Sequence, residues 1–110
     1  MQLLVVGSNP LMRRLVWDVV AGVVAHLRAC GNAAEAVAIH AGYHPDFVLT
    51  DADGIQAVPQ IRQAYPASRI IVIADYDDAD LRAQALEGGA SHYVLKEDMF
   101  SLLGLMNARA

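Results

Sequence analysis

Two apolar runs of this chain end in reactive side chains: "FVLTD" ends at Asp51 and "YVLK" ends at Lys96. A carboxylate and an amine that lie close together can pair with each other, or the amine can neutralise charge on a group at the carboxylate. A third apolar run, in "LLVVGSNP", is followed only by the small neutral residues Gly7, Ser8 and Asn9. The sequence therefore offers reactive groups at two of three comparable positions.

Short apolar runs alternate with helical patterns along the chain. Three of the runs are rich in β-branched residues, which is typical of buried parallel strands. We predict strands at Leu3–Val6, Val23–Leu27, Phe47–Thr50, Ile70–Ala74 and Tyr93–Leu95.

Helices are predicted between these strands and after the last one. Pro10 suits the opening turn of the first helix, and Asn32 suits the N-cap of a second helix over Ala33–Ala41, which Gly42 ends. The apolar positions Leu11, Leu15, Trp17 and Val19 define the first helix, and Ile55, Val58, Ile61 and Tyr65 define the third. The fourth helix contains Leu81, Ala85 and Leu86, follows a cap at Asp77 or Asp78 and ends at Gly88–Gly89. The fifth helix runs from about Met99 to the end.

This alternation indicates an α/β fold, a parallel sheet with helices on both faces. In open sheets of this kind the ligand site lies beyond the carboxyl ends of the strands. Gly7–Ser8, Asp51, Ala74–Asp75 and Lys96 all follow predicted strands. We therefore expect these residues to be neighbours.

The composition indicates one soluble domain over residues 1–110, because 55% of the residues are hydrophobic and 18% are charged. The eight Lys and Arg residues are scattered and the net charge is −4, so we expect no direct contact with nucleic acid. The longest apolar stretch, Val19–Ala25, is too short to span a bilayer, and no basic segment precedes the first apolar residues. We expect a cytoplasmic protein without membrane contact.

Histidine and cysteine provide no metal site in this interpretation. His40 and His44 have a spacing that can hold zinc on one helix, but Gly42 and Pro45 indicate that the helix ends there. Cys30 is the single cysteine. It excludes an internal disulfide, fits a reducing compartment and is interpreted as a buried small residue.

Four stretches resemble the receiver domain of response regulators, and together they cover nearly the whole chain. They are "LLVVGSNPLMRRLV", which is most similar to receivers joined to helix-turn-helix output domains of the NarL/LuxR type, "HPDFVLTD", "RIIVIADYDDADLRAQALEGGASHYVLKED" and, within it, the most specific stretch "GGASHYVLK". The resemblance implies a flavodoxin-like, CheY-like doubly wound sheet of five parallel strands in the order 2-1-3-4-5. It also implies a role in two-component signalling, phosphorelays and transcription regulation.

Members of this family accept a phosphoryl group on an aspartate in the presence of magnesium. The resemblance assigns Asp51 to this phosphoacceptor position and Lys96 to the lysine that pairs with the phosphoryl group. It assigns Tyr93 to the aromatic residue that changes position on activation.

Three positions depart from the family pattern. The acidic pair that binds the metal aligns with Gly7 and Ser8, and the Ser or Thr that contacts the phosphoryl group aligns with Ala74. The resemblance therefore implies a site that lacks both its metal carboxylates and its phosphate sensor.

The segment after Asp51 also differs from the family. Asp53–Gly54 follows almost at once, where the family has a longer loop. Pro59 falls inside the predicted third helix, where a proline is tolerated in the first turn but costs ~3 kcal/mol deeper. We expect this helix to begin near Val58 or to be kinked.

Each acidic residue near the site has two interpretations. Asp51 is a working phosphoacceptor, or a retained carboxylate that is solvated or paired with Lys96, and we favour the second. Asp53 and Asp75 are possible substitute acids for a cation site, but aspartate also suits turns and caps, which we favour. We assign no cofactor, and magnesium only if Asp51 is a phosphoacceptor.

Two segments are candidate contact surfaces. The acidic run Asp75–Asp80 is a docking patch or, as we favour, a solvated helix start. The final segment is apolar around much of its circumference and is either deeply buried or a contact face. Its apolar residues are Met99, Phe100, Leu102, Leu103, Leu105 and Met106.

Together these features predict an atypical receiver that is not an enzyme. It acts as a regulatory module that binds a protein partner, or itself as a homodimer, through the fourth helix, fifth strand and fifth helix. One alternative is a phosphorylatable receiver that uses Asp51 and a histidine kinase. A second is a small-molecule binder that uses the room left by Gly7, Ser8 and Ala74, although "VVGSNP" has no Gly-rich phosphate fingerprint.

Overall fold

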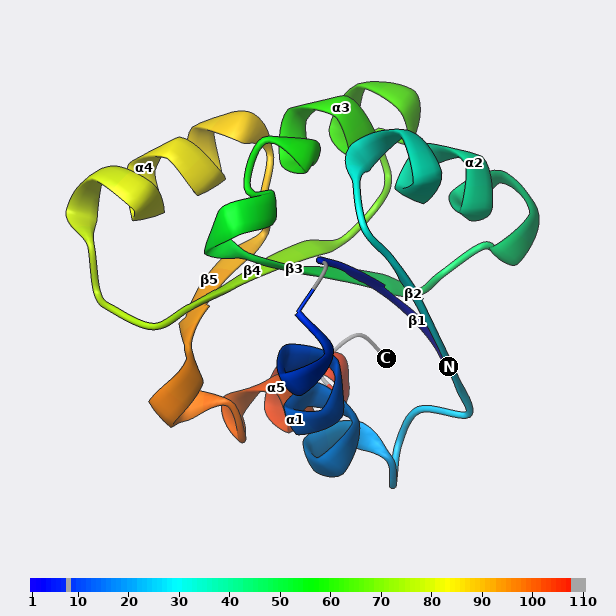
Figure 1. Cartoon of the computed structure of the whole chain (residues 1–110), viewed down its shortest axis with the longest axis horizontal. Coiled ribbons are helices and arrows are strands. Elements are labelled where there is room, and N and C mark those ends of the chain that lie inside the picture. Colours follow the sequence, from blue (N-terminus) through cyan, green and yellow to red (C-terminus); the bar gives the residue numbers. More distant parts are fainter. Residues whose placement is uncertain (8, 108–110) are drawn as a thin grey trace.

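A computed structural model describes residues 1–7 and 9–107 and shows a five-stranded parallel sheet in the order β2-β1-β3-β4-β5 (Figure 1). The predicted fold class and strand order are confirmed. The strands are β1 (Gln2–Val6), β2 (His26–Cys30), β3 (Phe47–Asp51), β4 (Ile70–Ala74) and β5 (His92–Leu95).

Helices cover both faces of the sheet. In Figure 1, α2, α3 and α4 lie on one face, and α1 and α5 lie on the other. The helices are α1 (Pro10–Val20), α2 (Ala33–Tyr43), α3 (Ala57–Ala64), α4 (Ala79–Gly88) and α5 (Ser101–Asn107), and short 3₁₀ turns η1 (Ala52–Gly54) and η2 (Lys96–Asp98) follow β3 and β5.

The two faces of the sheet form two separate cores, because successive residues of a strand point to opposite sides. On β1, Leu4 and Val6 pack into the core under α2, α3 and α4, whereas Leu3 and Val5 pack into the core under α1 and α5. All five residues of β4 are buried. This burial on both faces explains why the central strands are continuous apolar runs.

Side-chain caps fix the helix starts that bring the chain back to the sheet. The Asn32 side chain accepts from the Glu35 N–H at 2.9 Å, and Asp78 accepts from the N–H groups of Asp80 and Leu81 at 2.9 and 3.2 Å. The predicted caps of α2 and α4 are therefore confirmed. Gly89, at φ 117°, ends α4 in the left-handed conformation that favours glycine.

The predicted second strand was placed too early in the chain. The N–H groups of Val23 and Val24 donate to the Val20 carbonyl and close the turn after α1. The strand begins at His26, which pairs with Gln2. Because β2 is an edge strand with one exposed face, its sequence is less apolar than the turn before it.

The predicted apolar stripe of α1 was wrong at Leu11, Leu15 and Trp17, whereas the predicted Val19 is partly buried against the core under α1 and α5. Met12, Val16 and Val20 are the buried residues of this helix, whereas Leu11 is 63% exposed and Leu15 and Trp17 also reach the surface. The sequence of this helix contains two rows of apolar residues with the same helical spacing. The direction from which the helix packs on the sheet determines which row is buried.

Two helix boundaries clarify the predictions: the start of α3 and the end of α2. Helix α3 begins at Ala57, so Pro59 lies in its first turn, where its missing N–H costs little. Helix α2 continues through Gly42 to Tyr43, and His44 caps it at φ 52°. Since residues before a proline avoid the helical region, Pro45 rather than Gly42 marks the end.

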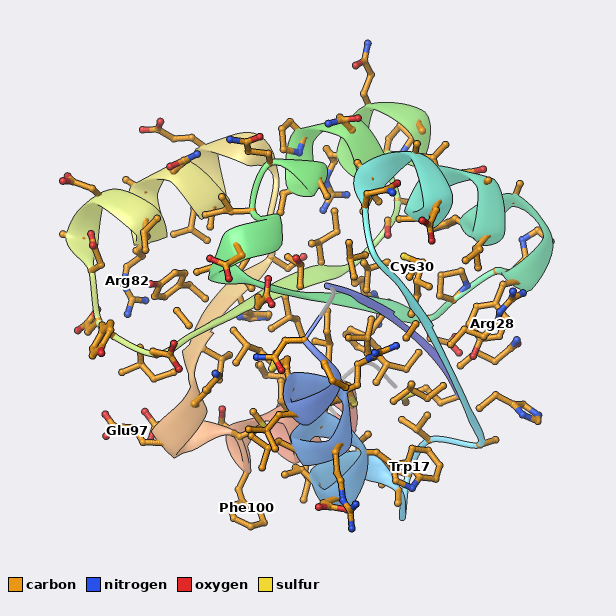
Figure 2. All side chains as sticks on the ribbon, in the orientation of Figure 1. Trp17, Arg28, Cys30, Arg82, Glu97 and Phe100 are labelled. Atoms are coloured by element: carbon orange, nitrogen blue, oxygen red, sulfur yellow. The ribbon has the colours of Figure 1, made fainter. Side chains whose placement is uncertain are left out.

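The C-terminal segment is partly buried and partly exposed. Met99, Leu102 and Met106 pack into the core under α1 and α5, whereas Phe100 is 75% exposed and projects away from the sheet (Figure 2). The helix begins at Ser101 rather than Met99, and the predicted continuation over residues 108–110 lies outside the described residues. Among the described residues, no helix is long and apolar enough to cross a membrane.

Candidate functional site

The predicted site residues meet at the carboxyl edge of the sheet. A cavity of about 70 Å³ is lined by the ends of β3, β4 and β5 and by the start of α1, and a second small cavity lies beside it near Gly7 and Gly54. Ser8 lies outside the described residues. The residues that line the first cavity are Asn9, Asp51, Ala52, Asp53, Ile73, Ala74, Asp75 and Lys96.

Asp51 acts as a cap in this structure. Its Oδ1 accepts the N–H of Gly54 at 2.8 Å, which closes the 3₁₀ turn that follows β3. The short link between Asp51 and Gly54 makes this bond possible. One carboxylate oxygen is therefore engaged by the backbone of its own loop.

Gly7 packs directly against the same carboxylate. Its φ is 152°, and a Cβ atom added to it would lie 3.0 Å from Asp51 Oδ2. The Gly7 N–H donates to the Cys30 carbonyl at 2.8 Å, which holds the backbone in place. Without a side chain, Gly7 permits this close approach, and a larger residue there would require movement.

Lys96 pairs with Asp75 and not with Asp51. The Lys96 Nζ lies 2.8 Å from Asp75 Oδ1, and among the described residues no ion pair joins Lys96 to Asp51. The interpretation of Asp51 as the partner of Lys96 is therefore wrong. The Asp75 side chain is 60% exposed, so this pair contributes little to stability, on the order of 0–1 kcal/mol. The pair matters because it engages the Lys96 ammonium group.

Tyr93 is buried and held from two sides. Its ring belongs to the core under α4, and its hydroxyl donates to the Tyr76 carbonyl at 3.0 Å. The Arg82 guanidinium lies 4.7 Å from the ring centroid and pairs with Asp77 at 2.7 Å. Strand β5 is thus tied to the loop between β4 and α4.

Ala74 ends β4 and is 3% exposed. It belongs to the same apolar cluster as Tyr93. A methyl group provides neither a donor nor an acceptor, so the Ala74 side chain cannot form a hydrogen bond to a group in the cavity.

A model of the response regulator receiver domain matches residues 3–105 of the chain. The chain belongs to this family. Its function is therefore that of a receiver domain in two-component signalling.

Known receivers resemble it over almost the whole length. The crystal structure of a LuxR-family two-component response regulator from Aurantimonas sp. SI85-9A1 superposes with a TM-score of 0.84 at 27% identity, covering 97% of this chain and 82% of that one. The chemotaxis protein CheY of Halobacterium salinarum is 27% identical over 86% of this chain and 83% of its own length.

Transcriptional regulators are similar over shorter segments. The uncharacterized transcriptional regulatory protein YhcZ of Bacillus subtilis is 41% identical over 58 residues, which make up 48% of this chain and 27% of that protein. The chain spans about a quarter of the length of the first curated relatives that it matches. The likeness to regulators of transcription, expected from "LLVVGSNPLMRRLV", is confirmed.

The described residues offer few ligands for the magnesium ion that the family implies. Gly7 stands at one position of the acidic pair, and no group of three or more His, Cys, Asp or Glu among the described residues has the geometry to hold a metal ion. Asp75, one of the possible substitute acids, faces Lys96. The short loop after Asp51 leaves Asp53 in the turn that Asp51 caps.

Sequence analysis missed the residues that hold Tyr93. Arg82 reaches both Tyr93 and Asp77, and the Tyr76 contact uses a backbone carbonyl. The five-residue spacing of Asp77 and Arg82 at a helix start was a weak signal for the ion pair. A backbone acceptor leaves no signal in the sequence.

Proposed function

We propose that this receiver works as a regulatory interaction module without normal magnesium-dependent phosphorylation. The observation that carries this proposal is the contact between Gly7 and Asp51. Where the family carries a metal-binding carboxylate, this chain has a glycine whose backbone closes on Asp51, with room for no side chain larger than hydrogen unless neighbours move.

Two further contacts support the proposal. Phosphoryl transfer depends on positive charge that neutralises the equatorial oxygens, and the ammonium available for this, Lys96, is paired with Asp75. The hydroxyl that would contact a phosphoryl group is replaced by the methyl of Ala74. Each of the three family functions at this site, metal binding, charge neutralisation and sensing, is weakened or lost.

The signalling surface in this proposal consists of α4, β5 and α5. Tyr93 is fixed in its inward position by Tyr76 and Arg82, so this surface is held in one state. Leu86 on α4 and Phe100 before α5 are exposed apolar side chains, 46% and 75% accessible, that a protein partner or a second copy can cover. A histidine kinase is a partner only in the phosphoacceptor alternative.

Incubation with magnesium and a small phosphodonor, followed by intact-mass measurement, tests the proposal. We expect no phosphoryl adduct on the folded wild-type chain, with folding verified by circular dichroism. Asp51→Asn is the control for acceptor identity. An adduct on the wild type that is absent from Asp51→Asn would establish the phosphorylatable alternative and overturn the proposal.

The small-molecule alternative receives less support at this edge. Ligand pockets for drug-sized molecules usually enclose ~300–1,000 Å³, whereas the cavity at Asp51 encloses about 70 Å³. Water or a small ion matches this volume better than an organic ligand.

A further inference from the structure

A larger pocket lies at the opposite, amino-terminal edge of the sheet. It encloses about 380 Å³, within the range of small-ligand sites. Its walls come from the end of α2, the end of α3 and the loops that lead into β3 and β4, and Figure 1 shows these two helices on the same face of the sheet. The polar residues that line it are His40, His44, Asp46, Tyr65 and Ser68.

The wall of this pocket contains a buried histidine with an unmet hydrogen bond. His40 is 8% exposed, and its Nε2 lies 3.3 Å from Ser68 Oγ. Its Nδ1 has no hydrogen-bond partner among the described residues. Buried polar atoms are normally paired, and an unpaired one calls for a missing partner such as a ligand.

An aromatic platform lies beside this histidine. The His40 and Tyr65 rings are stacked, with centroids 3.8 Å apart and an interplanar angle of 13°. Tyr65 OH donates to the Val37 carbonyl at 3.2 Å, which fixes the ring. Flat aromatic faces attract cations, and planar guanidinium groups in particular stack on them.

The electrostatics of the pocket favour a positive ligand. Helices α2 and α3 both end here, capped by His44 and Tyr65, so their carbonyl ends contribute partial negative charge. Asp46 adds a carboxylate, and no Lys or Arg is among the lining residues. Phosphates and carboxylates are therefore disfavoured here.

We propose that this pocket binds a small organic cation, a guanidinium or primary ammonium group, between the Tyr65 ring and the Asp46 carboxylate. Such a group brings N–H donors to the Asp46 carboxylate and to the carbonyls at the helix ends. The site is separate from Asp51, so the proposal is independent of whether Asp51 is phosphorylated.

Two matched probes test the role of charge: ethylguanidinium and ethylurea, which have nearly the same shape and differ in charge. We expect ethylguanidinium to shift the NMR signals of residues 40–46 and 64–68, and the imidazole signals of His40, in a saturable manner at millimolar concentration. Ethylurea should bind about tenfold more weakly, the change expected when a cation–aromatic attraction is lost. Equal midpoints for the two probes would overturn the proposal.

Two matched variants test the location. Asp46 Oδ2 accepts the Gln2 N–H at 2.7 Å, and Asp46→Asn keeps an oxygen for this bond while it removes the charge. We expect Asp46→Asn to weaken ethylguanidinium binding several-fold. Asp18→Asn, which removes the same charge from an exposed position on α1, should leave the affinity unchanged. Equal affinities for the two variants would contradict binding at Asp46. Signal shifts that do not saturate and that gather on the acidic residues 75–80 would indicate non-specific binding and would also contradict the proposal.

A third arm distinguishes a free ligand from the side chain of a partner. An acetylated and amidated Gly-Arg-Gly peptide carries the same guanidinium on a protein backbone. Binding as tight as that of ethylguanidinium supports capture of an arginine side chain. Binding of ethylguanidinium without binding of the peptide supports a free cation, because the backbone then fails to fit.

Discussion

At the scale of single residues, the partners of charged side chains set what this receiver can do. Asp51 caps the turn that follows it, and Lys96 faces Asp75. Asp51 and Lys96 are the residue types that the family has at these positions. Their contacts, with the Gly54 N–H and with Asp75, differ from the shared phosphoryl group that the resemblance implies for them. The identity of a residue is therefore not enough to assign its role at this site.

The buried His40 leads us to predict that stability depends on pH. Burial, with a contribution from the charge of His44, lowers the pKa of His40 below its usual value, although an interaction with its own backbone opposes this. Below about pH 6.5 the unfolded chain therefore binds more protons than the folded chain. The folded state keeps its full stability above this pH and loses part of it as the pH falls. We expect the free energy of unfolding to decrease from about pH 7 to pH 5.

Denaturant titrations at several pH values measure this decrease. His40→Gln should flatten the pH dependence in this window. His26→Gln, at an exposed position of β2, is the control for loss of an imidazole. An unchanged slope in His40→Gln would contradict the assignment.

At the scale of elements, caps and prolines located the helix starts well. Asp78 caps α4 and directly follows Tyr76 and Asp77, the residues that contact Tyr93 and Arg82. Asn32 and Pro59 likewise act through atoms of their own turn. These local effects are visible in the sequence because a cap contacts residues only two or three positions away.

Loss of the Asp78 cap should destabilise the protein measurably. We expect Asp78→Ala to lower the free energy of unfolding by ~1 kcal/mol, because two N–H groups of the first turn lose their acceptor. Asp78→Asn keeps the cap and removes the charge, so its free energy of unfolding should stay close to that of the wild type. Urea titration compares the variants. A loss in Asp78→Asn as large as that in Asp78→Ala would attribute the effect to charge.

At the scale of the whole molecule, exposed apolar side chains occur on both faces of the sheet. The proposed signalling surface carries Leu86 and Phe100, and α1 carries Leu11. Exposed side chains of this size favour association when they lie close together on one face. Phe100 precedes α5 and Leu11 lies on α1, so the proposed signalling surface and α1 can be tested separately.

We expect the protein to form a dimer in solution through α4, β5 and α5. Light scattering should give twice the mass of one chain, and Phe100→Ser should shift the equilibrium toward the monomer. Leu11→Ser removes another largely exposed apolar side chain, from α1, and should leave the dimer intact. A strictly monomeric wild type would argue against self-association and in favour of a different protein as partner.

The sequence by itself determined the α/β class, the strand order implied by the receiver resemblance, and the caps of α2 and α4. These features follow from periodicity and from contacts within a few residues, which a sequence displays directly. It also brought Asp51, Ala74, Asp75 and Lys96 to one edge, because parallel strands end together.

Only the tertiary structure determined which side chains these residues contact. The start of β2 and the buried stripe of α1 depend on packing against the sheet. The pairing of Lys96 with Asp75, and the position of Tyr93 against Arg82, join residues of different elements. Lys96, for example, lines the same cavity as Asp51, Asp53 and Asp75. The choice among them is made by distances of a few ångströms that the folded backbone sets and that residue types do not encode.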